Sequence, residues 1–272
     1  MLPSIDQEIA LAYQDGVVHP ENLPYLLTPE KPNDQGILLV HGFGSTPREL
    51  RELGNLLLTK NFTVLGVRLP GHGTSPEDLA ERTVEEWLST TERGFHILQQ
   101  RGLKISAVGL STGCLLLLQL ANQLPLERLV LLAPYLKLRH RLSPYAGFLS
   151  WFIPYQVREI DEKDQPYYYS KRPLKGVAQL NRLRKSAANQ LSSINTATLI
   201  LSSEGDRTVY PGTAEQLFNK LSSSEKHFHR YGLEVPHVLT ADDSPCRQDV
   251  LQRTLDFLKK SSPQTEISRH EK

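Results

Sequence analysis

Residues 107–124 read AVGLSTGCLLLLQLANQL, and they join an apolar run to a leucine-rich run through a short turn. Gly109, Ser111 and Gly113 make this turn a G-x-S-x-G pattern. A sharp turn from a strand into a helix holds a serine hydroxyl clear of the sheet edge, where it can act as a nucleophile. The alternative is an ordinary serine that caps the helix N-terminus. The pattern alone does not separate these two roles.

The chain around this turn alternates between strand and helix patterns. Short apolar runs predict strands over residues 36–43, 62–69, 104–110, 126–134, 197–206 and 226–232. Helical spacing of apolar residues predicts helices over 47–61, 83–102, 112–124, 212–222 and 245–260, with a further short helix over 4–14 and a frayed tail from Ser261. This alternation predicts an α/β fold with a mostly parallel sheet and helices on both faces.

One segment interrupts the alternation, between the strands predicted at 126–134 and 197–206. Residues 135–195 contain eleven Lys and Arg against four Asp and Glu, and six of the ten tyrosines. Its position predicts a lid (cap) over the carboxyl edge of the sheet, where open α/β sheets bind ligands. The predicted division is therefore a core of residues 1–134 and 196–272 with a lid of residues 135–195.

Two features of this segment have competing interpretations. Its stretch YAGFLSWFIPYQV (145–157) is either a helix face packed on the core, which we favour because such stripes are usually core, or an apolar face that meets lipid. Its excess of basic residues is either a solvated face, which we favour, or a surface that attracts anions.

A serine nucleophile needs a base, and on this kind of scaffold the chain order is Ser, then Asp or Glu, then His. His237 lies in a loop before the last helix, and Asp206 ends a predicted strand, so both fit this order. Glu204 is the competing acid, unless it is a solvated loop charge. The other histidines after Ser111 lie in the lid, on one strand or in the tail: His140, His227, His229 and His270.

The charge that develops on a substrate oxygen needs two preorganised N–H donors. Thr112, directly after the serine, offers one. The loop HGFGSTP (41–47) offers the other, because Gly42 and Gly44 let the backbone turn the Phe43 N–H inward. His41 and His72 lie in loops at the same edge, and we expect both to be structural.

The composition excludes several classes of protein. The 272 residues carry a net charge of +1, which gives no support to a nucleic-acid partner. Cys114 and Cys246 do not make a disulfide scaffold, and neither a signal peptide nor an apolar run of membrane-spanning length is visible. Phosphate-loop and dinucleotide motifs and metal-ligand spacings are absent. We therefore expect a soluble, cytoplasmic protein.

The combination of motifs resembles the serine α/β-hydrolases of the bacterial carboxylesterase and monoacylglycerol lipase group. The resemblance covers most of residues 36–134 and 197–260, and its carriers are LLVHGFGSTPRELREL, RLPGHGTSPEDLAERTVEEW, GLSTG, LSSEGDRTVYP and SSSEKHFHRYGLEVPHVLTADD. It implies the α/β-hydrolase fold and no metal or organic cofactor. It also implies that Ser111 is the nucleophile and that Asp206 and His237 are its partners. The backbone N–H groups of Phe43 and Thr112 would be the oxyanion donors.

The chain departs from the group in two places. The group often has GLSMGG where this chain has Thr112 and Cys114, and residues 135–195 do not match it. Since lids set substrate choice in this group, three functions stay open. The first is hydrolysis of small-molecule or lipid-derived esters by a carboxylesterase or monoacylglycerol lipase. The second is a thioesterase or acyltransferase that uses the same triad, and the third is a non-catalytic binding protein. Oligomeric state is not predicted.

Overall fold

In the computed structural model, which describes residues 2–140 and 143–260, seven strands form one central sheet. The strand order is β1-β3-β2-β4-β5-β8-β9, and every neighbouring pair is parallel except β1 with β3. The strands are β1 (Tyr25–Leu27), β2 (Gln35–Val40), β3 (Thr63–Val67), β4 (Lys104–Leu110), β5 (Arg128–Leu132), β8 (Ala197–Ser203) and β9 (Lys226–Tyr231). The predicted mostly parallel sheet is confirmed. The tail from Ser261, with His270, lies outside the described residues.

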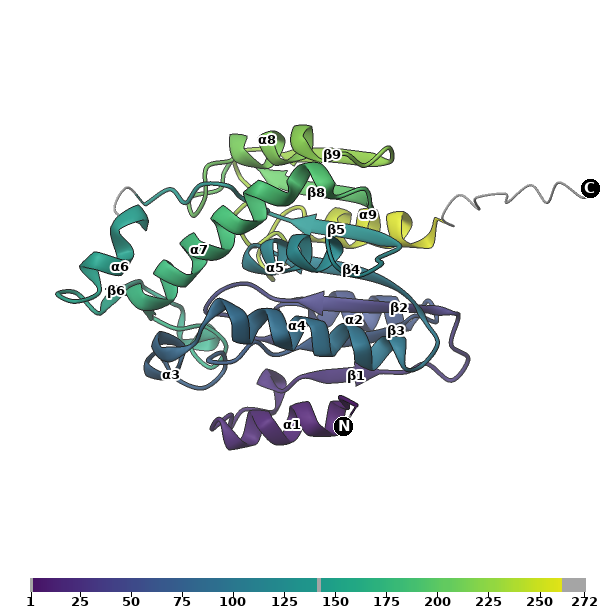
Figure 1. The fold of residues 1–272 in the computed structure, drawn as a ribbon, viewed down its shortest axis with the longest axis horizontal. Coiled ribbons are helices and arrows are strands. Elements are labelled where there is room, and N and C mark those ends of the chain that lie inside the picture. Colours follow the sequence, from purple (N-terminus) through teal and green to yellow (C-terminus); the bar gives the residue numbers. More distant parts are fainter. Residues whose placement is uncertain (1, 141–142, 261–272) are drawn as a thin grey trace, which may run out of the picture.

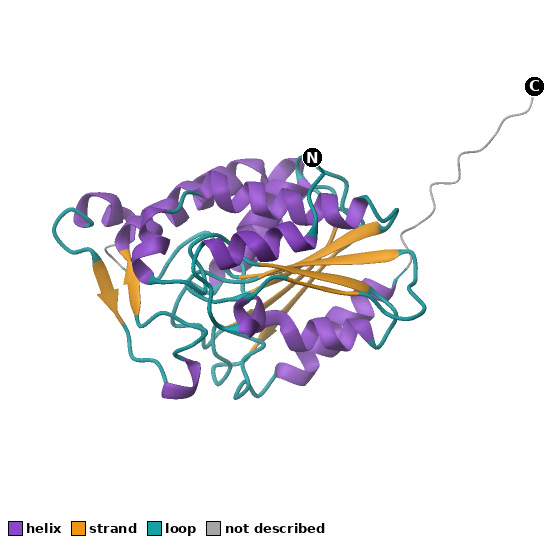
Figure 2. Cartoon of the chain, turned by 90° about the horizontal axis from the view of Figure 1, so that it is seen from below, coloured by secondary structure: helices purple, strands orange, loops and turns teal. Residues whose placement is uncertain are grey.

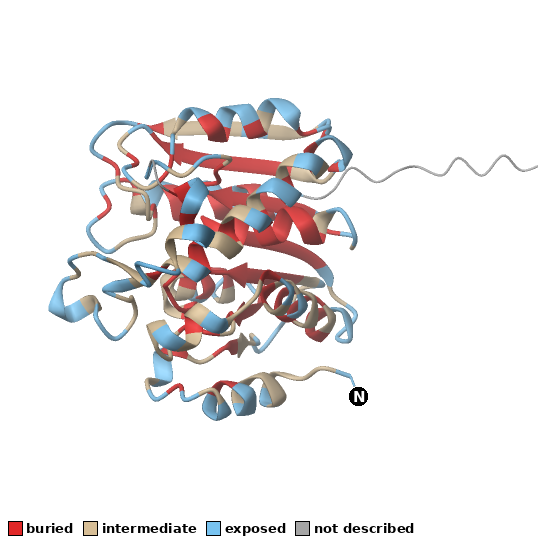
Figure 3. Cartoon of the chain, turned by 60° about the vertical axis from the view of Figure 1, so that its left-hand side comes forward, coloured by how far each residue is buried: buried red, intermediate tan, exposed pale blue. Residues whose placement is uncertain are grey.

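Both faces of the sheet are buried, which explains the nearly continuous apolar runs of its strands. In β2, Leu38 and Val40 pack into the core on one face, while Ile37 and Leu39 pack into the core on the other. The side-chain period of two along a strand produces this division. Figure 3 shows the strands as the most deeply buried part of the molecule.

Helices cover both faces of the sheet (Figures 1 and 2). One face carries α4 (Val84–Gln99), α5 (Thr112–Ala121), α7 (Leu174–Gln190) and α8 (Gly212–Lys220), and the other carries α2 (Arg51–Leu58) and α9 (Arg247–Lys259). The helix predicted over 4–14 is present as α1 (Ile5–Gln14), with a capping box between Ser4 and Gln7. The sequence did not predict α3 (Pro76–Glu81) or the edge strand β1. No described helix combines the length and hydropathy needed to cross a membrane.

The first part of the segment 135–195 lies beyond the carboxyl ends of the sheet strands, at the left of Figure 1, and its last helix runs back over α5. The segment contains α6 (Ala146–Leu149), a hairpin of β6 (Tyr155–Val157) and β7 (Lys171–Pro173), and α7. The 17-residue helix α7, which the sequence did not predict, packs against α5. Leu180 and Leu183 of α7 are part of the same core as β4 and α5. The assignment of 135–195 as a separate lid stays a prediction.

The interpretation of 145–157 as a packed helix face is wrong. The four-residue helix α6 is too short to present a helical stripe, and only the small side chain of Ala146 is buried there among the described residues. Trp151 is 87% exposed and Phe152 is 73% exposed. Four further apolar side chains are exposed with them: Tyr145, Phe148, Ile153 and Val157.

Candidate active site

Ser111 lies in a tight turn between the end of β4 and the start of α5. Its backbone has φ 53° and ψ −108°, a conformation that costs a non-glycine residue about 1–3 kcal/mol. Its N–H donates to the carbonyl of Leu132 at 2.8 Å, which ties the turn to the neighbouring strand β5. The Ser111 side chain makes no capping hydrogen bond to α5. The helix-cap alternative is therefore wrong.

The glycines on each side of Ser111 let the strand and the helix approach closely. A Cβ at Gly113 would lie 2.0 Å from the carbonyl oxygen of Val40 in β2. A Cβ at Gly109 would lie 2.6 Å from the carbonyl carbon of Gly113. Both distances are far below van der Waals contact, so the turn needs glycine at both positions.

The imidazole of His237 lies between Ser111 and Asp206. His237 Nε2 is 2.8 Å from Ser111 Oγ, and Nδ1 makes a short hydrogen bond to Asp206 Oδ2. The other carboxylate oxygen of Asp206 accepts the backbone N–H groups of Thr208 at 2.8 Å and Val209 at 2.9 Å. Asp206 is 2% exposed. The structure thus brings three sequence-predicted residues together, and a network of hydrogen bonds orients them.

The competing acid, Glu204, lies elsewhere. Its side chain is half exposed and is 3.8 Å from the guanidinium of Arg230. Although Glu204 is only two residues from Asp206, the turn after β8 directs Asp206, and not Glu204, toward His237. Of these two candidate acids, only Asp206 therefore contacts the imidazole.

His41 and His72 are buried in the loops at this edge of the sheet. The N–H of Leu69 donates to His41 Nε2 at 3.2 Å, so His41 Nδ1 carries the proton and donates to the Gly42 carbonyl at 2.8 Å. Burial lowers the pKa of His41 to about 4, and burial and the neighbouring His41 lower the pKa of His72 well below its ordinary value. Both histidines are neutral supports of the loops.

The backbone N–H groups of Phe43 and Thr112 point to no acceptor in the described part of the chain. The N–H of Gly42, one residue earlier, donates to Glu49 Oε2 at 2.7 Å. Glu49 Oε1 accepts the hydroxyl of Tyr168 at 3.2 Å, and burial raises the pKa of Glu49. Sequence reasoning missed Glu49 and Tyr168, since Glu49 is indistinguishable from a surface residue of a short helix. These contacts fix the loop and leave two N–H donors free near Ser111.

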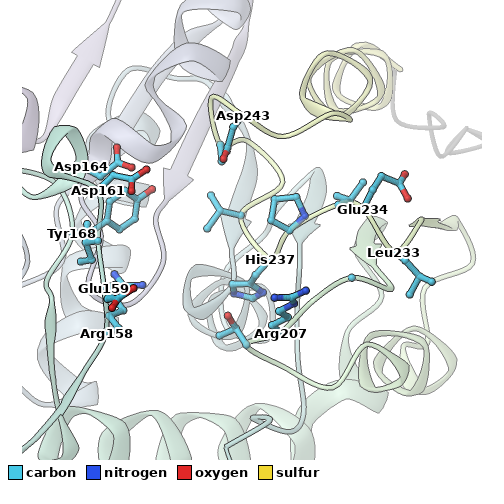
Figure 4. Close-up of a pocket in the computed structure, with 17 residues that line it drawn as sticks. Arg158, Glu159, Asp161, Asp164, Tyr168, Arg207, Leu233, Glu234, His237 and Asp243 are labelled. Carbon is cyan, nitrogen blue, oxygen red and sulfur yellow. The ribbon is translucent and has the colours of Figure 1, made fainter.

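Two neighbouring cavities lie at the site: His237 lines both, and Ser111 lines the smaller one. The smaller, of about 90 Å³, includes Ser111, Phe43, Thr112 and His237, and its other walls come from Tyr135, Leu138, Arg158, Tyr168, Arg172 and Leu180, among others. The larger, of about 590 Å³, is drawn in Figure 4 and shares His237, Val238, Thr208, Arg158 and Tyr168 with the smaller one. The described residues include no group of three or more His, Cys, Asp or Glu side chains that could hold a metal ion.

The chain is similar to known hydrolases over most of its length. A model of the alpha/beta hydrolase family matches residues 37–241. A thermostable monoacylglycerol lipase from Bacillus sp. (strain H-257) is 33% identical over 236 residues, which cover 83% of this chain and 90% of the relative. A carboxylesterase from Bacillus subtilis (strain 168) is 27% identical over 235 residues, which cover 85% and 94%. A solved structure from work on the metagenome-derived lipolytic enzymes LipS and LipT has a TM-score of 0.80 at 25% identity and covers 90% of this chain and 100% of the other.

These similarities bear out the resemblance and the fold that the sequence predicts. Both relatives are named as carboxylic ester hydrolases, the predicted class of enzyme. The family model also begins in β2, just before the loop of Phe43, and ends beyond His237, so it spans the whole candidate site. The chain belongs to the alpha/beta hydrolase family.

Proposed function

We propose that the protein hydrolyses carboxylic esters of small molecules, as a carboxylesterase or monoacylglycerol lipase does, through an acyl-enzyme on Ser111. The observation that carries the proposal is the imidazole of His237, which is hydrogen-bonded to Ser111 on one side and to Asp206 on the other. The names of the two relatives support esters as the substrate class.

The proposed first step is attack of Ser111 Oγ on the ester carbonyl carbon. His237 Nε2, 2.8 Å away, accepts the hydroxyl proton, because a neutral serine hydroxyl is a poor nucleophile. Asp206 accepts the hydrogen bond from Nδ1–H, which keeps Nε2 unprotonated before attack and stabilises the imidazolium afterwards. In this proposal Asp206 is therefore the acid that orients the imidazole of His237.

The negative charge on the substrate oxygen is then held by the N–H groups of Phe43 and Thr112. Thr112 is the first residue of α5, so its N–H also carries the partial positive charge of a helix N-terminus. Glu49 supports the first donor from behind, since its bond to the Gly42 N–H fixes the loop that presents Phe43. The donors are in place before reaction, which is what stabilises developing charge most effectively.

Collapse of the tetrahedral intermediate breaks the bond to the alcohol oxygen, and His237 gives its proton to that oxygen. Water then attacks the acyl-enzyme with His237 again as the base, and the acid is released. Because His237 protonates the leaving oxygen, the alcohol part of the substrate extends on the His237 side of Ser111, where the larger cavity lies.

Initial hydrolysis rates on p-nitrophenyl esters from acetyl to palmitoyl test the proposal. We expect activity to peak at short chains, because the cavity of about 90 Å³ beside Ser111 is too small for a long acyl chain. Ser111→Ala should lower kcat by at least about 10⁴-fold without changing the thermal unfolding temperature. Ser222→Ala, an exposed serine outside both cavities, is the matched control. Equal rates for Ser111→Ala and the parent would overturn the mechanism.

We also propose that the protein works in a reducing compartment, such as the cytoplasm. Cys114 and Cys246 are both buried as free thiols, which fits a setting where cysteines stay reduced.

A further inference from the structure

Two arginines from the segment 135–195 reach the smaller cavity. Arg172 lies in β7, and Arg158 directly follows β6, so the two residues come from the same hairpin. Both side chains line the wall of the cavity that holds Ser111 and Thr112. Figure 4 shows Arg158 across the pocket from His237.

Neither guanidinium forms an ion pair within 4.0 Å with a carboxylate among the described residues. Arg158 Nε donates to the backbone carbonyl of Tyr169 at 3.0 Å, while the side chain of Arg172 makes no hydrogen bond to a described residue. Burial, together with the nearby charge of Arg158, lowers the pKa of Arg172 to about 10, so Arg172 stays charged at neutral pH. Two partly buried positive charges are therefore available to a ligand in the cavity.

The acidic groups near the arginines are held by other partners or are exposed, although the charge of Glu49 acts on Arg158. Glu49 also lines the small cavity, but it already accepts the Gly42 N–H and the Tyr168 hydroxyl, and burial raises its pKa. The buried carboxylate of Asp206 is bound to His237. The carboxylates that line the larger cavity are mostly on exposed side chains: Glu159, Asp161, Asp164, Glu234 and Asp243. Beside Ser111, Asp206 is thus held by His237 and Glu49 by the Phe43 loop, while Arg158 and Arg172 have no carboxylate of the described chain within ion-pair distance.

We propose that Arg172 and Arg158 bind a carboxylate on the acyl group, so that the preferred substrates are monoesters of short dicarboxylic acids. This inference rests on the proposed function. If the alcohol extends into the larger cavity, the acyl group occupies the smaller one, and its volume of about 90 Å³ suits a chain of a few carbons. A guanidinium fits a carboxylate through two parallel hydrogen bonds. The arginines would then anchor the far end of the acyl chain.

The test compares monoethyl succinate with ethyl 4-methylpentanoate, which replaces the carboxylate with a neutral isopropyl group of the same shape. We expect kcat/KM of the parent to be at least about 10-fold higher for the charged ester, as for a charged hydrogen bond. This preference should fall with added salt, which screens charge. An equal or higher kcat/KM for the neutral ester would overturn the proposal.

Variants of Arg172 test whether the preference for the charged ester depends on this side chain. Arg172→Met should lower the ratio of the two kcat/KM values by roughly 10- to 100-fold, and Arg172→Lys should retain part of the preference. Lys171→Met is the matched control: it removes one positive charge from the same strand, but Lys171 is exposed and lines neither cavity. A ratio unchanged in Arg172→Met, or lowered equally in Lys171→Met, would contradict an anion site at Arg172.

A binding measurement separates this proposal from the proposed function. Calorimetric titration of Ser111→Ala protein with the two intact esters needs no turnover. Tighter binding of monoethyl succinate, lost in the Ser111→Ala, Arg172→Met double variant, would support the anion site even if neither ester is hydrolysed. Hydrolysis of the neutral ester alone, with no preferential binding of the charged one, would leave the esterase standing and overturn the anion site.

Discussion

The side chain of Asp206 meets the two demands on the acid of a serine triad: it is buried, and both of its oxygens have fixed partners. One oxygen holds His237 Nδ1, and the other accepts the N–H groups of Thr208 and Val209. Arg139 also donates to the Asp206 backbone carbonyl at 2.7 Å, which anchors the turn. The carboxylate is therefore held in one orientation before any substrate binds.

Asp206→Asn should lower kcat by about 10⁴-fold, because an amide N–H facing Nδ1 would stabilise the imidazole tautomer that carries its proton on Nε2. The shape of the site stays the same, so KM and the unfolding temperature should change little. The measurement is steady-state kinetics on a p-nitrophenyl ester. Glu204→Gln, an acid-to-amide change at a half-exposed neighbour, should keep parent activity. Loss of activity in Glu204→Gln, with Asp206→Asn unaffected, would reverse the assignment of the acid.

At the scale of elements, the junction of β4, α5 and β2 sets the position of Ser111. The helix α5 begins so close to β2 that the Cα of Gly113 faces the Val40 carbonyl directly. The loop of Phe43 follows Val40 by three residues. The proposed nucleophile Ser111 and one of the proposed oxyanion donors thus depend on the same contact between a helix and a strand.

Gly113→Ala should lower the free energy of unfolding by about 3 kcal/mol or more, because the new methyl would lie 2.0 Å from a backbone oxygen that cannot move without distorting the sheet. Activity should fall as well, since the shift displaces Ser111 from the Phe43 loop. Urea unfolding and ester hydrolysis measure the two effects. At Gly147 in α6, the nearest atom to an added Cβ is 3.7 Å away. Gly147→Ala should therefore leave the free energy of unfolding and the ester hydrolysis rate nearly unchanged. Equal losses in Gly113→Ala and Gly147→Ala would contradict this account.

At the scale of the whole molecule, buried histidines make stability depend on pH. Protonation of His41 and His72 is disfavoured in the folded protein, whereas an unfolded histidine has a pKa of about 6.5. Between these values the unfolded chain binds more protons, so folded stability is full above pH 6.5 and falls as the pH drops toward 4. Glu49, whose pKa is raised, has the opposite dependence and favours the folded state at low pH.

We expect His41 alone to account for a loss of about 3 kcal/mol between pH 6.5 and 4, from a pKa difference of roughly 2.5 units. Urea midpoints at intervals between pH 7.5 and 4.5 measure this loss. His41→Asn should be less stable at pH 7.5, yet its stability should change less over the same range. If the urea midpoints of His41→Asn fall with pH as steeply as those of the parent, His41 does not contribute to the acid sensitivity.

The fold and the three central residues of the site follow from the sequence because their signals are local or ordered along the chain. Strands buried on both faces need continuous apolar runs, and a tight strand-to-helix turn needs small residues beside the serine. The chain order of Ser111, Asp206 and His237 then restricts the partners to a few candidates.

Only the tertiary structure decided the rest, because it depends on segments that are far apart in the chain. The contact of His237 with Asp206, and not with Glu204, follows from the turn after β8. The support of the Phe43 loop by Glu49 depends on Tyr168, 119 residues further on. The placement of Arg158 and Arg172 beside Ser111, and the exposure of residues 145–157, depend on how a hairpin and a short helix pack over the sheet edge. Side-chain patterns record whether a segment is amphipathic, but not which surface it meets.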